Sequence, residues 1–210
     1  MIRVLVADDH SVVRRGVRQI LCEEFESVEV GEAGDSEQLA MLLKERSWDL
    51  VILDITLPGK SGLEVLQEIK GSYPQLKVLI LSMHPEDQFA IRMLRAGAAG
   101  YLTKERAPEE LILAVKRVLS GRRYLTESLA ETLAGYVEAE GRVPPHTALS
   151  DREFQVLRMM ASGKGVSEIA DELGLSVKTI STYRTRILEK MRMRTNAEVI
   201  HYAIKHGLVD

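Results

Sequence analysis

Three acidic side chains follow two hydrophobic segments in the first 60 residues. Asp8 and Asp9 come directly after residues 2–7, and Asp54 follows residues 50–53. Segments of this length, rich in Val, Ile and Leu and without polar alternation, are typical of strands buried on both faces of a parallel sheet. The carboxyl ends of such strands share one edge, where open α/β sheets bind ligands. Carboxylates that lie close repel one another unless a cation lies among them, so this edge is predicted to hold a divalent metal.

Two further apolar segments end near polar groups of other kinds, the Ser82 hydroxyl and the Lys104 ammonium. A carboxylate that acted as a nucleophile here would attack a phosphorus atom and become an acyl phosphate. Asp54 is the candidate for that role, because the adjacent pair Asp8 and Asp9 is better placed to hold the metal. Lys104 and Ser82 would then bind the oxygens of the transferred group.

Oxygen atoms are the ligands that Mg²⁺ takes in proteins, from a few carboxylates together with water and a phosphoryl oxygen. Asp8, Asp9 and Asp54 supply such carboxylates, and the backbone carbonyl of Thr56 can complete the set. An acidic residue at a strand end can also be no more than a turn residue. Residues of all the required types, each at its own strand end, argue against coincidence and predict a phosphoryl site that uses Mg²⁺.

The composition is that of an ordinary globular protein with room for two domains: 210 residues, 45% of them apolar and 28% charged. No apolar run approaches the roughly 18 residues of a membrane span. No basic segment with a cleavage site opens the chain. The single cysteine, Cys22, excludes an internal disulfide, fits a reducing compartment and is expected to be a buried structural thiol. We therefore expect a cytoplasmic protein with no membrane partner.

Strand and helix patterns alternate five times over residues 1–120, which predicts an α/β domain with a doubly wound, five-stranded parallel sheet. A linker is predicted at 121–147, with a possible short helix near 127–137. Residues 148–210 are predicted to form a small all-α domain. Predicted helices cover residues 11–24, 36–46, 61–71, 86–97, 108–120, 151–161, 166–173, 177–191 and 195–205.

Residues 167–180 have the pattern of a helix, a tight turn and a second helix. Gly174 can take the left-handed conformation that ends the first helix, and Ser176 can cap the second. Ala170 is small enough for the two helices to cross closely, which completes a helix-turn-helix pattern. Although the whole chain has a net charge of −3, residues 176–194 contain six basic side chains and one acidic side chain. This local excess predicts a polyanion as the partner.

The second helix of this motif has a polar face. Such a face is often only a solvated surface, but the turn and the basic excess favour contact with double-stranded DNA. The short side chains of Ser181, Thr182 and Thr185 are predicted to meet base edges in the major groove. Longer side chains around them are predicted to contact phosphates, with Thr179 also among the DNA-binding residues: Lys178, Tyr183, Arg184, Arg186 and Lys190.

Residues 1–120 resemble the receiver domain of response regulators, which has a flavodoxin-like fold. The matching stretches are Asp8-Asp9-His10, Leu53-Asp54, Leu57-Pro58-Gly59, Leu81-Ser82, residues 96–101 and Leu102-Thr103-Lys104. The resemblance implies that Asp54 accepts a phosphoryl group from the phosphohistidine of a sensor histidine kinase. It implies the Mg²⁺ ligands already named, with the Thr56 carbonyl among them. It also implies that Ser82 and Tyr101 act as a hydroxyl and aromatic switch pair beside Lys104.

Residues 148–210 resemble the LuxR-type helix-turn-helix domain of the NarL/FixJ response regulators. The matching stretches are residues 149–153, Glu168-Ile169-Ala170, Lys178-Thr179-Ile180, Lys190-Met191 and residues 203–208. Residues 182–186 are similar to the GacA/UvrY branch, with Tyr183 where many relatives have His. The resemblance implies a homodimer on DNA, paired through the last helix near residues 196–206.

Both halves together predict a phosphorylation-controlled, DNA-binding transcription regulator of a two-component system. It is not expected to be a metabolic enzyme, because its phosphoryl chemistry would act only on itself. Two alternatives stay open: a phosphate sink or docking module with weak DNA binding, and DNA binding that does not depend on phosphorylation. The sequence leaves open the kinase, the DNA site and the direction of regulation.

Overall fold

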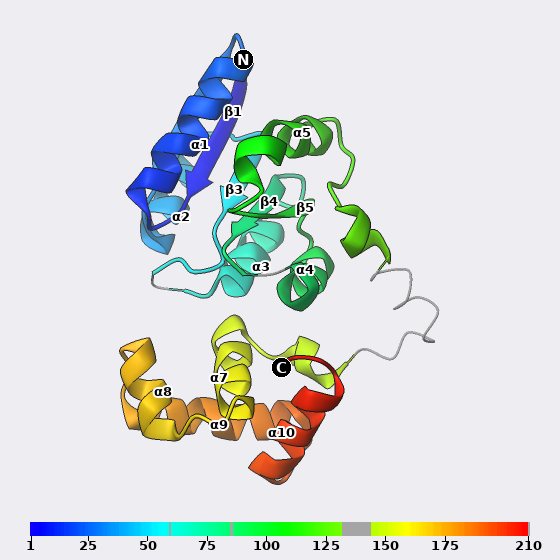
Figure 1. The fold of residues 1–210 in the computed structure, drawn as a ribbon. Coiled ribbons are helices and arrows are strands. Elements are labelled where there is room, and N and C mark those ends of the chain that lie inside the picture. Colours follow the sequence, from blue (N-terminus) through cyan, green and yellow to red (C-terminus); the bar gives the residue numbers. More distant parts are fainter. Residues whose placement is uncertain (59, 85, 132–143, 210) are drawn as a thin grey trace. The chain divides into compact units, whose positions relative to one another are not determined.

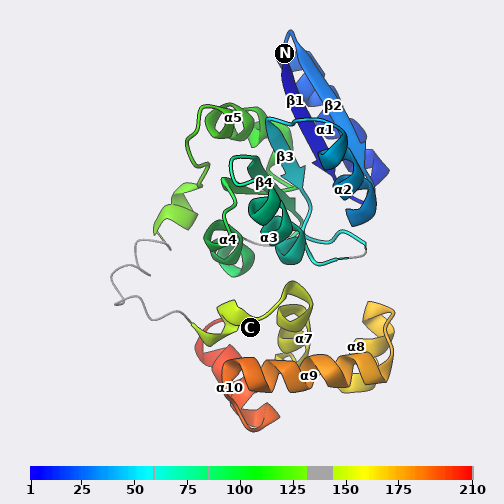
Figure 2. The ribbon, with the colours of Figure 1, turned by 180° about the vertical axis from the view of Figure 1, so that it is seen from behind.

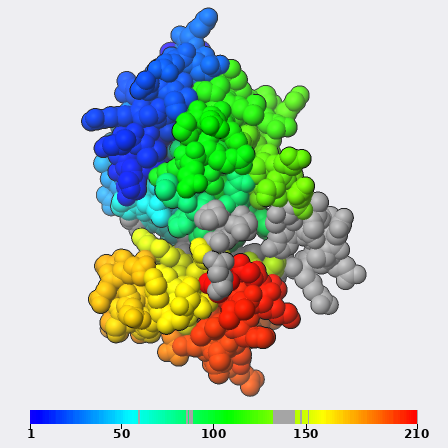
Figure 3. Space-filling model, in the orientation of Figure 1, coloured from blue at the N-terminus to red at the C-terminus, as the bar shows by residue number. Residues whose placement is uncertain are grey.

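The computed structural model describes residues 1–58, 60–84, 86–131 and 144–209. These residues belong to two compact units, Met1–Gly141 and Arg142–Asp210. Each unit packs as a body of its own, the first coloured blue to green and the second yellow to red in Figure 3. The linker limits predicted at 121 and 147 stay predictions, and residues 132–143 of that stretch lie outside the described residues.

The first unit contains a parallel sheet in the order β2-β1-β3-β4-β5. This order confirms the predicted doubly wound, five-stranded sheet, because the chain starts in the middle, turns to one edge and then builds toward the other. The strands are β1 (Ile2–Ala7), β2 (Val28–Ala33), β3 (Leu50–Leu53), β4 (Lys77–Ser82) and β5 (Gly100–Thr103).

Helices cover both faces of this sheet (Figures 1 and 2). One face packs against α1 and α5, through alternate strand residues such as Val4, Val6 and Ile52. The other face lies under α2, α3 and α4. The helices are α1 (Ser11–Glu24), α2 (Ser36–Glu45), α3 (Gly62–Ser72), α4 (Glu86–Arg95) and α5 (Ala107–Leu119).

The expectation for Cys22 was wrong, because its thiol is exposed. Neighbouring helix residues differ by about 100° in direction. In α1 it is Leu21, fully buried, that points into the core, and Cys22 therefore points outward. None of the helices in the described part of the chain is both long and apolar enough to cross a membrane.

In the second unit, residues 144–209 form helices joined by short turns. Ser150 and Glu153 form a capping box at the start of α7, since each side chain accepts a hydrogen bond from the backbone N–H of the other. Phe154, Ile180 and Val199, from three different helices, are fully buried. The elements are η1 (Pro145–Ala148), α7 (Asp151–Ala161), α8 (Val166–Leu173), α9 (Val177–Met191) and α10 (Asn196–Lys205).

Candidate phosphoacceptor site and nucleic-acid interface

The pairing of β1 with β3 brings Asp8 and Asp54 together. Ala7 is paired with Leu53 in the sheet, so the residue after each strand lies at the same edge. The Asp54 N–H donates a hydrogen bond to the Ala7 carbonyl at 2.8 Å, which extends the pairing one step beyond the strands. Each of the two aspartates is only 1% exposed. Two buried carboxylates side by side create a strong demand for positive charge.

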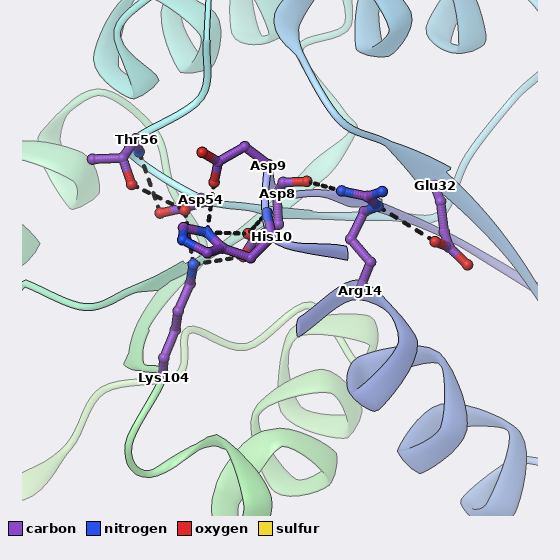
Figure 4. Close-up of polar contacts among 8 residues, drawn as sticks. All are labelled: Asp8, Asp9, His10, Arg14, Glu32, Asp54, Thr56 and Lys104. Carbon is purple, nitrogen blue, oxygen red and sulfur yellow. Dashed lines mark hydrogen bonds and ion pairs between the residues drawn. The ribbon is translucent and has the colours of Figure 1, made fainter. Parts of the chain in front are cut away.

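Lys104 supplies that charge (Figure 4). It follows β5, and its Nζ lies 2.7 Å from Asp8 Oδ2 and 2.8 Å from Asp54 Oδ2. Burial alone would lower the pKa of Lys104, but the hydrogen bonds and charges of Asp54 and Asp8 outweigh it and raise the pKa above its ordinary value. The ammonium is therefore charged at neutral pH and bridges the two carboxylates.

The donor set suits a hard divalent cation. Carboxylate oxygens of Asp8, Asp9 and Asp54 and a ring nitrogen of His10 all lie within 4.8 Å of one another. Asp8 Oδ2 is buried, and it lies in an ion pair with Lys104. A buried carboxylate oxygen whose neighbour is a cation is compatible with a metal ligand, and Mg²⁺ prefers oxygen donors of this kind.

His10 lies at the exposed rim of this site. Its ring Nδ1 is 2.6 Å from Asp9 Oδ1 and 3.2 Å from Asp8 Oδ1, although the side chain is 60% exposed. The His10 N–H also donates to Asp8 Oδ1 at 2.8 Å.

Thr56 holds the carboxylate of Asp54 in place. Its backbone N–H donates to Asp54 Oδ1 at 3.2 Å, and its hydroxyl donates to Asp54 Oδ2 at 3.0 Å. Both contacts place Thr56 in the loop directly above Asp54 (Figure 4). The predicted use of its carbonyl as a metal ligand stays a prediction.

Ser82 and Tyr101 are linked through the loop that follows β4. Both side chains are fully buried. The Ser82 hydroxyl accepts a hydrogen bond from the His84 N–H at 3.1 Å, and the Tyr101 hydroxyl donates to the His84 carbonyl at 2.8 Å. The two predicted switch residues therefore hold the same residue of the β4–α4 loop.

Arg14 is a site residue that the sequence did not reveal. Its guanidinium donates to the Asp8 carbonyl at 2.6 Å, and its Nε lies 3.4 Å from Glu32 (Figure 4). This contact fixes the backbone between Asp8 and α1. A signal existed in the helical spacing, which places Arg14 one turn after His10 and on the same side of α1.

The helix-turn-helix geometry is confirmed in the second unit. Gly174 ends α8 in the left-handed conformation, with φ 64°, and the Leu175 N–H donates to the Ala170 carbonyl at 2.9 Å. The Ser176 hydroxyl accepts from the Thr179 N–H at 3.1 Å and caps α9. Its oxygen also lies 2.8 Å from the Thr179 hydroxyl, so Thr179 takes part in the cap.

The polar face of α9 is exposed, as expected. Its hydroxyl groups are turned toward the helix itself: Thr182 donates to the Lys178 carbonyl at 3.0 Å, and Thr185 donates to the Ser181 carbonyl at 3.1 Å. A hollow runs along this face and is lined by Ser176, Lys178, Thr179, Thr182, Tyr183 and Arg186. Val177, the first residue of α9, is 50% exposed, and Ile180 one turn later is the first buried residue of the helix.

Two of the residues that were predicted to contact phosphates bind other residues of the second unit. The Lys190 ammonium lies 2.6 Å from Glu153, whose carboxylate is 2% exposed, and Arg184 Nε donates to Asn196 at 2.7 Å. Burial alone would raise the pKa of Glu153, but Lys190 and the Ser150 N–H outweigh burial and lower it. Lys178 and Arg186 are exposed cations on the same helix without such contacts among the described residues. Their side chains are the more available for DNA.

Two family models match the chain. The response regulator receiver domain matches residues 4–116, and the luxR family of bacterial regulatory proteins matches residues 147–203.

Curated relatives match over the full chain. It is 39% identical over 212 residues to the response regulator UvrY of Escherichia coli K12, covering 100% of this chain and 97% of that protein. It is 38% identical over 211 residues to the response regulator GacA of Pseudomonas aeruginosa, covering 100% and 99%. Among solved structures, RcsB of Salmonella enterica serovar Typhimurium bound to promoter DNA with the phosphomimetic BeF₃⁻ has 30% identity and a TM-score of 0.61, covering 96% of this chain and 97% of that one.

Proposed function

The chain belongs to the two-component response regulators that join a receiver domain to a LuxR-type DNA-binding domain, and from this premise we propose that Asp54 is its phosphoacceptor. The observation that carries the proposal is the Lys104 ammonium bridging Asp54 and Asp8 at the carboxyl ends of the strands. This arrangement concentrates positive charge at the place where a phosphoryl group would arrive.

Mg²⁺ bound by the carboxylates of Asp8, Asp9 and Asp54 and by the Thr56 carbonyl would neutralise charge on the incoming phosphoryl oxygens. An Asp54 oxygen would attack the phosphorus atom of a sensor kinase's phosphohistidine. A P–O bond forms, the P–N bond breaks, and the imidazole keeps the electron pair of that bond. Lys104, already within 2.8 Å of Asp54, would stay with the new acyl phosphate as an ion-pair partner.

Phosphorylation would reach Tyr101 through Ser82. The Ser82 hydroxyl would donate to a phosphoryl oxygen and draw the β4–α4 loop toward Asp54. The His84 carbonyl, which accepts from Tyr101 at 2.8 Å, moves with that loop. To change the ratio of active to inactive molecules from 1:99 to 99:1, the active state must be stabilised by about 5.5 kcal/mol. The contacts of the phosphoryl group would supply part of this free energy, and dimerisation and DNA binding would supply the rest.

The exposed face of α9 is proposed to enter the major groove. Ser181, Thr182 and Thr185 would face base edges, while Lys178 and Arg186 would meet phosphates, with Thr179 and Tyr183 beside them. Arg184 and Lys190 would contribute to phosphate binding only if they leave Asn196 and Glu153.

The proposed partners are double-stranded DNA, a sensor histidine kinase and, after activation, a second copy of this chain. Support comes from RcsB, which has been solved as dimers bound to DNA and with promoter DNA in the presence of BeF₃⁻. A dimer would place two recognition helices about one turn of DNA apart. A protein that meets both a kinase and chromosomal DNA is proposed to act in the cytoplasm.

Phosphorylation with a small acyl-phosphate donor and Mg²⁺ tests the acceptor. Asp54→Asn should abolish incorporation. Asp49→Asn is the matched control, because Asp49 precedes the same strand at the opposite end of the sheet. The control should be labelled like the wild type. Equal labelling of the Asp54 variant would contradict the proposal.

A further inference from the structure

The residues after α5 return to the sheet and cover its open edge. β5 is an edge strand, and edge strands expose unpaired backbone groups. Here the Tyr124 N–H donates to the Ala99 carbonyl at 2.9 Å, and Tyr124 forms a parallel bridge with Gly100. A Cβ on Gly100 would lie 2.9 Å from both the Cβ and the carbonyl oxygen of Tyr124, so only glycine allows this approach.

Side chains fix the same stretch, residues 124–129, which we call the anchor segment. The Tyr124 hydroxyl donates to the carboxylate of Glu110 on α5, and the Thr126 hydroxyl donates to the carboxylate of Glu86 at the start of α4. Tyr124 is 4% exposed and Leu129 is 1% exposed. Burial and the Glu110 contact raise the pKa of Tyr124, so its hydroxyl remains a donor at neutral pH.

The two attachments of the anchor segment lie on different parts of the receiver. Tyr124 is attached to β5 and α5, which are packed into the sheet. Thr126 is attached to Glu86, two residues beyond His84. His84 is the loop residue held by both Ser82 and Tyr101. A movement of the β4–α4 loop would therefore shift one attachment relative to the other.

We propose that the edge formed by β5 and the start of α4 is a docking surface for the anchor segment, and that phosphorylation of Asp54 releases the Thr126 end of it. The inference rests on the proposed function of Asp54. When Ser82 turns to the phosphoryl group, the loop carries Glu86 away, while Tyr124 stays on β5. The bond from Thr126 to Glu86 then breaks, and Leu129 loses its buried position.

Release would lengthen the connection that leads toward the DNA-binding unit. Each extended residue spans about 3.4 Å, so residues 126–131 reach up to roughly 20 Å once freed. That reach would allow two DNA-binding units of a dimer to meet neighbouring half-sites.

Hydrogen exchange followed by mass spectrometry on the full chain, with Mg²⁺ and with or without BeF₃⁻, tests the proposal. The amides to watch are those of Leu129 and Ala130, which donate to the Thr126 hydroxyl and carbonyl. Their exchange should rise at least about tenfold with BeF₃⁻, while the Tyr124 amide stays protected. In Thr126→Val the Ala130 amide, whose acceptor is the backbone carbonyl of residue 126, should show the same rise without BeF₃⁻ and increase little further. The Leu129 amide does not serve in this variant, because the substitution itself removes its acceptor. Glu86→Gln should also raise the exchange of the Leu129 and Ala130 amides without BeF₃⁻, because a neutral amide oxygen accepts a weaker hydrogen bond from Thr126 than a carboxylate does.

Glu127→Gln is the matched control, since it removes a neighbouring exposed charge and leaves these contacts intact; it should respond like the wild type. If BeF₃⁻ changes exchange in residues 86–94 but leaves Leu129 and Ala130 protected, the docking inference fails and the proposed function stands. If BeF₃⁻ changes neither region, the proposed function fails together with the inference.

Discussion

Lys104→Met should weaken the receiver unit by removing the cation between two buried carboxylates. The Lys104 side chain is 7% exposed, and those of Asp8 and Asp54 are 1% and 0% exposed. Methionine fills a similar volume and leaves no charge, so the change isolates the electrostatic contribution. The cost of the substitution is that of leaving two buried carboxylates without their cation.

Breaking a buried ion pair costs about 3–5 kcal/mol. The free energy of unfolding should therefore fall by about 3–5 kcal/mol in EDTA. Mg²⁺ should restore part of this loss, and should stabilise the variant more than the wild type because no ammonium competes for the carboxylates.

Urea unfolding followed by the fluorescence of Trp48, the one tryptophan of the chain, reports on the receiver unit. Lys116→Met is the matched control, because Lys116 pairs with Glu24 at the surface, where the side chains are 52% and 43% exposed. Such a pair contributes less than about 1 kcal/mol. Equal losses in both variants, or a Lys104 variant as stable as the wild type in EDTA, would refute the reasoning.

Three further outcomes are expected. The pKa of Glu153 is lowered, so its contribution to stability is complete above its ordinary pKa and is lost as the pH falls through the folded-state pKa. The protection of the α7 amides against hydrogen exchange should therefore decrease in acid, and Glu153→Gln should reduce this dependence on pH. Lys178→Ala should reduce the slope of log affinity against log salt concentration by about one and leave the sequence preference unchanged. Thr182→Ala or Thr185→Ala should instead change the preference at one base position by about 1–3 kcal/mol. The reverse pattern would mean that Lys178 reads bases and the threonines contact phosphates. If the His10 imidazole is a metal ligand, His10→Ala should weaken the binding of Mn²⁺ more than that of Mg²⁺, because Mg²⁺ prefers oxygen ligands. Equal effects on the two metals would exclude His10 as a ligand.

Uninterrupted apolar segments and the helical patterns between them predicted most of the fold. The apolar segments ending at Asp8, Asp54 and Ser82 predicted the strands. Because these strands are parallel, their carboxyl ends predicted the edge at which Lys104 meets two carboxylates. The capping residue Ser176 marked the start of α9 correctly, because the first backbone N–H groups of a helix need a local acceptor.

Contacts between distant residues could not be predicted in the same way. Thr126 meets Glu86 across 40 positions, and Lys190 meets Glu153 across 37, so no local spacing records either pair. Cys22 was misplaced because two neighbouring apolar residues compete for one buried direction of a helix. Arg14 was missed because its partner is a backbone carbonyl, which every residue possesses.

Selection of genomic DNA fragments by the purified full chain, with and without Mg²⁺ and BeF₃⁻, tests the central claim most directly. The account predicts enrichment of a paired half-site only when the phosphomimetic is present, and no such gain in Asp54→Asn. Equal enrichment in both conditions would contradict control by Asp54, and no enrichment in either would favour a phosphate sink or docking module over a regulator that acts on DNA.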